Sequence, residues 1–254
     1  MNQRELRSHP VITSHKLGLV PARSLAVLLL AACAIGSLSG CARSATHASS
    51  PQARLSGEQA LVEKSAAAFS RLREDQRFAA MATQLQRARA VMIFPRVVKA
   101  SLIVGGEGGS GVLVAKQADG SWSGPAFYSV GSPSLGLQAG YQQATVVLLI
   151  MDQPTLERVL HSSLMLGGNA GATLGKVDEI DGNNSDVLSA NIYQVIDAEG
   201  AFAGLSLDGY VIGARPQHNR NYYGKPVTPG QILLDGSAAN PGSAVLTNAL
   251  QPKT

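Results

Sequence analysis

Cysteine is scarce in this sequence: only Cys33 and Cys41 occur among its 254 residues. The segment from residue 42 to residue 254 therefore has no thiol. This excludes internal disulfides, catalysis by a cysteine thiolate and metal sites built from cysteine for that segment. It still contains about 200 residues, which is enough to form one hydrophobic core without cross-links.

Long apolar runs are also lacking. The run at residues 25–35 is too short to cross a ~30 Å hydrocarbon layer as a helix. It follows several basic residues and ends at Leu-Ser-Gly-Cys, residues 38–41. A basic segment, a short apolar segment and small residues in this order are typical of a secretory signal. We therefore predict that residues 1–40 are a signal peptide.

The Leu-Ser-Gly-Cys motif is typical of bacterial lipoproteins, in which the cysteine becomes the N-terminus and carries acyl chains such as palmitate. We predict that Cys41 is lipidated. An ordinary signal peptide with an unrelated cysteine, or an uncleaved anchor, is the alternative. Ala42 and Arg43 follow, without the aspartate that commonly retains lipoproteins in the inner membrane. We therefore expect the lipidated protein to lie at the periplasmic face of an outer membrane.

Residues 41–55 are mostly small and polar, which predicts a flexible tether with a reach of ~20 Å. The remaining residues, 56–254, are expected to form a single domain.

Basic residues exceed acidic ones by four in the whole chain, but the excess is mostly in the predicted signal. Without residues 1–40 there are 17 Lys and Arg against 16 Asp and Glu, so the charge does not predict nucleic-acid binding.

The charge of residues 42–254 is unevenly distributed along the chain. Residues 42–116 have eleven basic and five acidic side chains, and residues 117–254 have six and eleven. This favours a basic face with an anionic partner, although a solvated helix face without a partner has the same composition.

The first half of the predicted domain has helical periodicity. Ser56 and Gln59 form a capping-box pattern that predicts a helix start at Ser56. A second helix is predicted from about residue 75 to residue 88, with Phe78 and Met81 on its apolar face. The arginines of these segments lie off the apolar stripes.

Strand patterns follow from residue 90. Residues 90–94 predict a strand that Pro95 stops, and the apolar residues 146–151 predict a central strand buried on both faces. A helix capped by Asp152 should extend to about residue 164, and a short one is possible within residues 241–250. Shorter strands are predicted near residues 190–196, 204–207 and 210–214. We therefore predict an α+β fold: a single domain with N-terminal helices packed on a curved, mainly antiparallel sheet, either open or closed into a barrel.

Two motifs have a structural interpretation that we prefer. Gly106, Gly108 and Gly111 match the G-x-G-x-x-G pattern, but residues 112–114 continue as a strand, so we predict a glycine-rich hairpin and no nucleotide cofactor. Acidic residues gather between Asp178 and Asp186, where a solvated turn is favoured over a Ca²⁺ site. No cofactor, metal or catalytic residue is therefore predicted.

Several motifs occur in a characteristic order between residues 66 and 224. They are Phe94-Pro95 with Lys99, the cluster ending at Gly111-Val112-Leu113, residues 122–127 (Trp-Ser-Gly-Pro-Ala-Phe), Gly131, Gly136, Gln138 and Gly140, residues 200–209 (Gly-Ala-Phe-Ala-Gly-Leu-Ser-Leu-Asp-Gly) and Tyr223-Gly224. In this order the chain resembles the SYLF domain family. The resemblance implies binding of anionic lipid headgroups without catalysis. One departure is Glu199, where relatives often have a basic residue.

The function expected from the sequence is that of a membrane-tethered lipoprotein whose domain binds anionic phospholipids. The predicted lipid-binding residues are Arg71, Arg73, Arg77, Arg87, Arg89, Arg96 and Lys99. A structural or protein-interaction lipoprotein of the cell envelope with an acidic partner is the alternative. A third hypothesis is an enzyme with a polar site around Arg215, His218 and Tyr222 in a loop. A deep cleft that joins these residues to a carboxylate would support it.

Overall fold

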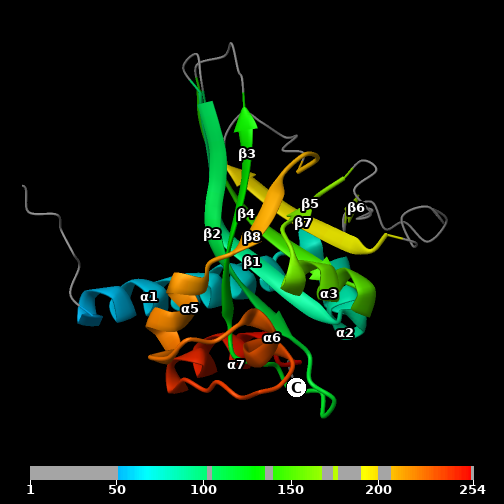
Figure 1. Cartoon of the computed structure of the whole chain (residues 1–254). Helices are drawn as coiled ribbons and strands as arrows, with labels where there is room; N and C mark the ends of the chain where they lie inside the picture. The colour runs from blue at the N-terminus through cyan, green and yellow to red at the C-terminus, as the bar shows by residue number, and fades with distance from the viewer. Residues whose placement is uncertain are drawn as a thin grey trace, which may run out of the picture. The chain divides into compact units, whose positions relative to one another are not determined.

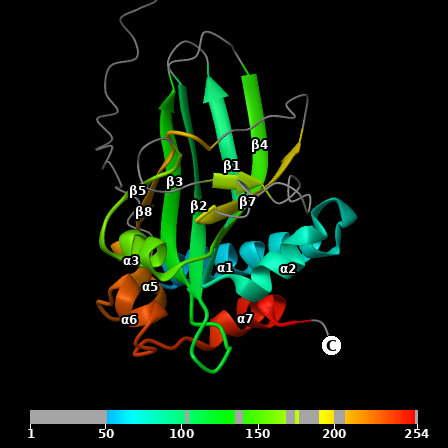
Figure 2. The same ribbon diagram turned by 90° about the vertical axis from the view of Figure 1, so that its right-hand side faces the viewer.

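Eight strands form one sheet in the computed structural model, which describes residues 51–101, 105–134, 140–167, 174–176, 190–199 and 207–252. The strands are β1 (Ala90–Ser101), β2 (Gly105–Ala115), β3 (Ala126–Ser134), β4 (Gly140–Ile150), β5 (Leu164–Met165), β6 (Leu174–Lys176), β7 (Ile192–Glu199) and β8 (Val211–Ala214). Their order is β5-β8-β3-β2-β1-β4-β7-β6, and every pair is antiparallel except β6 with β7. The sheet is strongly curled (Figures 1 and 2). The predicted α+β class and mainly antiparallel sheet are confirmed.

Helices cover both faces of this sheet. They are α1 (Pro51–Glu74), η1 (Gln76–Phe78), α2 (Ala80–Arg87), α3 (Gln153–His161), α5 (Pro216–Tyr223), α6 (Pro229–Leu233), η3 (Pro241–Ser243) and α7 (Ala244–Leu250). The predicted short helix at residues 241–250 is confirmed by η3 and α7. Within the described ranges, no helix has both the length and the apolar character needed to cross a membrane.

Alternating side chains of the central strands form two separate cores. Val91 and Ile93 of β1 pack with α1, α2 and α7 on one face, whereas Met92 and Phe94 pack with α3 and α6 on the other. All four are fully buried. Successive strand residues point to opposite faces, so a strand between two helical layers must be apolar at every position. The predicted two-sided burial of residues 146–150 in β4 is confirmed.

Pro95 does not end the first strand, contrary to the prediction. β1 continues to Ser101, and its register shifts around Pro95 against both β2 and β4. A bulge accommodates a residue that has no N–H to donate to the sheet. The Pro95 carbonyl still has a partner, because it accepts a hydrogen bond from Thr145 Oγ1 at 3.2 Å.

The glycine cluster lies within β2 rather than in a turn. β1 and β2 form the predicted hairpin, and β2 continues beyond Gly111 to Ala115 as the sequence predicted. A Cβ atom at Gly109 would lie 2.5 Å from the Arg96 carbonyl oxygen, and one at Gly111 would overlap the Ile93 carbonyl. Glycine is therefore needed here because the two backbones approach closely at the bulge.

Other predicted boundaries differ from the structure. α1 begins at Pro51, so Ser56 is inside the helix and does not cap it, and the last five residues of the predicted tether are helical. Proline fits the first turn because the N–H groups there need no helical partner.

α3 has the predicted cap, with Asp152 accepting a hydrogen bond from the Thr155 N–H at 2.7 Å, but the helix ends at His161 rather than near residue 164. β7 and β8 match two of the short predicted strands. Of the third, Leu207 is outside any strand and residues 204–206 lie outside the described ranges.

Candidate functional site

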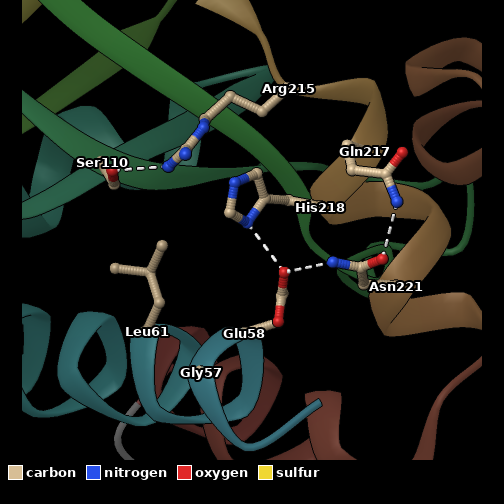
Figure 3. A pocket seen from close by; sticks show the side chains of 8 residues that line it. All are labelled: Gly57, Glu58, Leu61, Ser110, Arg215, Gln217, His218 and Asn221. Atoms are coloured by element: carbon tan, nitrogen blue, oxygen red, sulfur yellow. Dashed lines mark hydrogen bonds and ion pairs between the residues drawn. The ribbon is translucent and has the colours of Figure 1, made fainter. Parts of the chain in front are cut away.

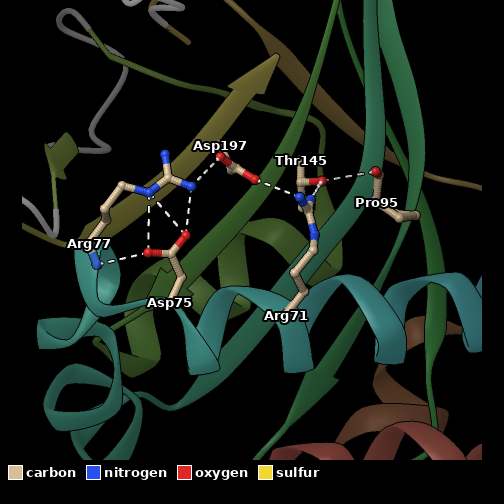
Figure 4. A network of polar contacts seen from close by, with 6 residues as sticks. All are labelled: Arg71, Asp75, Arg77, Pro95, Thr145 and Asp197. Atoms are coloured by element: carbon tan, nitrogen blue, oxygen red, sulfur yellow. Dashed lines mark hydrogen bonds and ion pairs between the residues drawn. The ribbon is translucent and has the colours of Figure 1, made fainter.

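Arg71 and Arg77 share one carboxylate, that of Asp197 (Figure 4). Arg71, near the end of α1, contacts Asp197 at 2.9 Å, and Arg77 of η1 contacts it at 3.1 Å. Arg71 also donates to Thr145 Oγ1 at 3.1 Å. The Asp197 side chain on β7 is 8% exposed, whereas the two arginine side chains are 53% and 65% exposed. A carboxylate this buried needs charged partners, so the two guanidinium groups stabilise its position while they remain at the surface.

Asp75 completes this network. It is the N-cap of η1, and its carboxylate contacts the Arg77 guanidinium at 2.6 Å. The side-chain hydrogen bond from Arg77 lowers the pKa of Asp75, and the same bond raises the pKa of Arg77. A cavity of about 160 Å³ lies beside the network, lined by Arg71, Pro95, Arg96, Gln143, Ala144, Thr145 and Asp197. The structure thus brings Arg71, Arg77 and Arg96 together, as a group that we call the Asp197 cluster.

Other predicted lipid-binding residues lie apart from this cluster. Arg73 is partly buried and donates to the Gln251 carbonyl at 2.6 Å. Arg87 and Arg89 are exposed at the end of α2 and just before β1. In the part of the chain that the structure describes, neither has a carboxylate partner. The side chain of Lys99 lies outside the described residues.

Lys116 is a further basic residue, near the end of α2, that was not predicted from the sequence as a binding residue. Its Nζ donates to the carbonyls of Leu85 and Gln86 at the end of α2, at 3.2 and 2.8 Å, and lies 5.1 Å from the centre of the Trp122 ring. A cation at the C-terminal end of a helix stabilises the helix dipole. Burial lowers the pKa of Lys116, and the nearby charge of Arg89 lowers it further. Lys116 and Arg73 line a cavity of about 460 Å³ with Trp122 and Leu250. The predicted basic residues thus do not form one group, because Arg73 lines this cavity and Arg71 and Arg96 line the one beside Asp197.

A larger cavity of about 670 Å³ lies between α1 and α5 (Figure 3). It is lined by Gly57, Glu58, Leu61, Ser110, Arg215, Gln217, His218 and Asn221. His218 Nδ1 contacts the Glu58 carboxylate at 2.7 Å, and Asn221 Nδ2 donates to the same oxygen at 3.1 Å. Across the cavity, the Arg215 guanidinium donates to Ser110 Oγ at 2.6 Å. We call this the α1–α5 cavity.

The third hypothesis from the sequence is corrected by this geometry. His218 does meet a carboxylate, that of Glu58, whereas Arg215 donates to Ser110 Oγ; both residues belong to the start of α5 rather than to a loop. The Tyr222 side chain is 2% exposed and packs edge-on against Phe127 in the core, with ring centres 5.2 Å apart. Tyr222 is therefore not among the residues that line the cavity with Arg215 and His218. Pro216 at the helix start was the signal for α5 that could have been read from the sequence.

Glu58 could not be identified from the sequence, because it lies in a helix 160 residues before His218 and follows no motif. Of the residues described, no group of three His, Cys, Asp or Glu side chains could hold a metal ion. The acidic segment from Asp178 to Asp186, and Cys41 with the predicted signal and most of the tether, lie outside the described residues.

Comparison with known proteins identifies relatives. The family described as "Ysc84: Las17-binding protein actin regulator" matches residues 131–252. The SH3 domain-containing protein PJ696.02 of Schizosaccharomyces pombe is 32% identical over 164 residues, 63% of this chain and 38% of that protein. The human SH3 domain-containing YSC84-like protein 1 is 30% identical over 150 residues, 58% of this chain and 44% of that protein.

A further relative is the LAS seventeen-binding protein 3 of Saccharomyces cerevisiae, 30% identical over 153 residues, 59% of this chain and 33% of that protein. The chain therefore spans less than half of the length of each of these relatives. No solved structure matches the chain.

Proposed function

We propose, from the match of residues 131–252 to the Ysc84 (SYLF) family, that the chain is a membrane-tethered lipoprotein whose domain binds anionic lipid headgroups without catalysis. Support comes first from the relatives, which are named as binding or SH3 domain-containing proteins rather than as enzymes. It comes second from the basic surface residues around α1, η1 and α2.

The observation that carries the proposal is an excess of exposed positive charge on this part of the domain. In the Asp197 cluster, the side chains of Arg71 and Arg77 remain 53% and 65% exposed although they pair with Asp75 and Asp197. Arg87 and Arg89 add two exposed charges that have no carboxylate partner within the described ranges. Basic side chains near an anionic membrane contribute about 1 kcal/mol each, so such a surface favours anionic over neutral lipid.

We also propose that Cys41 is acylated and holds the domain at the periplasmic face of an outer membrane. Each buried methylene of an acyl chain contributes about 0.8 kcal/mol, so the anchor would determine how long the protein stays on the membrane. The tether would raise the local concentration of the basic surface without adding contacts. The arginines would then set the orientation of the domain on the membrane and its lipid preference.

Mass spectrometry of the protein purified from membranes should find acyl chains on Cys41, and Cys41→Ser should release the protein into the soluble fraction. An unacylated wild-type protein would contradict the tether.

Vesicle sedimentation tests the headgroup proposal. Residues 42–254 should bind vesicles that contain phosphatidylglycerol, and should bind neutral phosphatidylcholine vesicles much more weakly. Arg87→Glu with Arg89→Glu should weaken the binding by roughly thirtyfold or more at low salt, since each lost charge is worth about 1 kcal/mol. The matched control is Arg220→Glu with Lys225→Glu, two exposed residues in and just after α5 that change the total charge by the same amount. An equal loss in both pairs, or equal binding to neutral vesicles, would contradict the proposal.

An interaction protein of the cell envelope with an acidic protein partner is the second candidate. The family description and the yeast relative's name both state binding to a protein, and the same exposed arginines would suit an acidic surface. Pull-down from membranes with and without detergent separates the candidates. A partner that remains bound after detergent has removed the lipid would favour the protein interaction.

A further inference from the structure

Arg215 is a half-buried cation without a carboxylate partner in the described part of the chain. A guanidinium has five N–H donors, and Ser110 Oγ accepts from only one of its nitrogens. Arginine removed this far from water is normally paired with an anion. The unused donors border the α1–α5 cavity, so they are available to a ligand that enters it.

His218 presents a second donor position to the same cavity. Its Nδ1 is held by Glu58, which is 4% exposed, and its ring lies 6.3 Å from that of Phe127. A buried carboxylate on one ring nitrogen orients the imidazole and directs the other nitrogen away. In Figure 3 that second nitrogen lies on the side of the ring that faces Arg215. An imidazolium in this position would donate to Glu58 with one nitrogen and to a ligand with the other.

The charges and donors of the cavity indicate the class of ligand. With His218 protonated, the two cations exceed the Glu58 carboxylate by one positive charge. A phosphate monoester has three terminal oxygens and a charge of about −1.5 to −2 near neutral pH. Those oxygens can accept paired hydrogen bonds from the planar guanidinium and a further one from the imidazolium. The volume of about 670 Å³ also lies in the range of small-molecule sites, with Leu61 available to contact an apolar part of the ligand.

We propose that the α1–α5 cavity is a binding site for a phosphate monoester, held by Arg215 and His218. The proposal does not depend on headgroup binding by the arginines of α1, η1 and α2. The same chemistry is found in a small soluble phosphate and in a lipid with a terminal phosphate group. The two sources are separated by the experiment.

In the first arm, residues 42–254 are titrated with inorganic phosphate and with glycerol 3-phosphate by isothermal calorimetry. Arg215→Gln should weaken the binding at least tenfold, because a charged hydrogen-bond donor is lost. Arg220→Gln is the control, since Arg220 is an exposed arginine of the same helix and does not line the cavity. In the wild-type protein, the imidazole NMR signals of His218 should shift during the titration. This readout remains informative if Arg215→Gln fails to fold.

In the second arm, vesicles with phosphatidic acid are compared with vesicles of equal phosphatidylglycerol content, whose phosphate is a diester. Arg215-dependent binding of both soluble phosphates supports a soluble ligand. Arg215-dependent preference for phosphatidic acid without binding of soluble phosphate supports a lipid source. The proposal is overturned if neither arm depends on Arg215, if Arg220→Gln has an equal effect, or if the His218 signals do not move. Since Arg87→Glu with Arg89→Glu tests the other surface, failure here is distinguishable from failure of the headgroup proposal.

Discussion

Asp197→Asn should strengthen binding to anionic vesicles. Asp197 neutralises part of the charge of Arg71 and Arg77, which it contacts at 2.9 and 3.1 Å. The amide removes one negative charge and therefore raises the net charge of the Asp197 cluster by one. One added positive charge near an anionic surface is worth about 1 kcal/mol, so the partition coefficient should rise roughly fivefold at low salt.

The same substitution should cost little stability. Arg71 and Arg77 remain 53% and 65% exposed, so water can solvate both guanidinium groups after the carboxylate is lost. Ion pairs with such exposed partners are typically worth about 0.2–1 kcal/mol each. A small decrease of the melting temperature is therefore expected, and circular dichroism can measure it.

The assay is sedimentation of residues 42–254 with phosphatidylglycerol vesicles across a range of salt concentrations. The gain from Asp197→Asn should shrink at high salt, because the Debye length is only about 10 Å at 0.1 M. Asp235→Asn is the control, as it changes the total charge equally at an exposed residue just after α6. If folded Asp197→Asn binds no better than the wild type, or if Asp235→Asn gives the same gain, the Asp197 cluster does not contact headgroups.

Two further predictions concern the fold that supports these surfaces. Burial raises the pKa of Asp152, but hydrogen bonds from Asn191 and Thr155 outweigh it, so the pKa is lowered overall. The stability from this carboxylate is therefore complete above about pH 4, its unfolded pKa, and is lost as the pH falls through the lower folded pKa. Asp152→Ala should lower the free energy of unfolding by about 1 kcal/mol at pH 7. Asp152→Asn should retain the cap, and the difference in stability between Asp152→Asn and the wild type should disappear in acid. Urea unfolding at several pH values can check both outcomes. Gly111→Ala should lower the free energy of unfolding by about 1–3 kcal/mol in the same assay, since its Cβ would overlap the Ile93 backbone. Gly57→Ala in α1 is the control, because its Cβ has open space and the substitution should be neutral or stabilising. Equal effects at both glycines would contradict the close approach of β1 and β2.

Much of the fold could be predicted because its signals are local. Two-sided burial of residues 146–150 in β4 follows from their unbroken apolar sequence, and the start of α3 follows from Asp152 with Pro154. The signals failed where a neighbouring strand decides the structure. Pro95 stops an isolated strand pattern, yet β2 and β4 hold β1 on both sides and a bulge absorbs the proline. The glycines of β2 likewise serve the contact between strands rather than a turn.

The sequence by itself determined that basic residues are concentrated before residue 117, because charge is a property of composition. Only the tertiary structure decided how these residues are grouped. Asp197 on β7 joins Arg71 and Arg77 across 120 residues or more, while Arg73 turns to the Gln251 carbonyl instead. The α1–α5 cavity has the same origin, since Glu58 and His218 meet only when the first helix packs beside α5. Contacts between residues so distant in the chain depend on packing, and no local spacing encodes them.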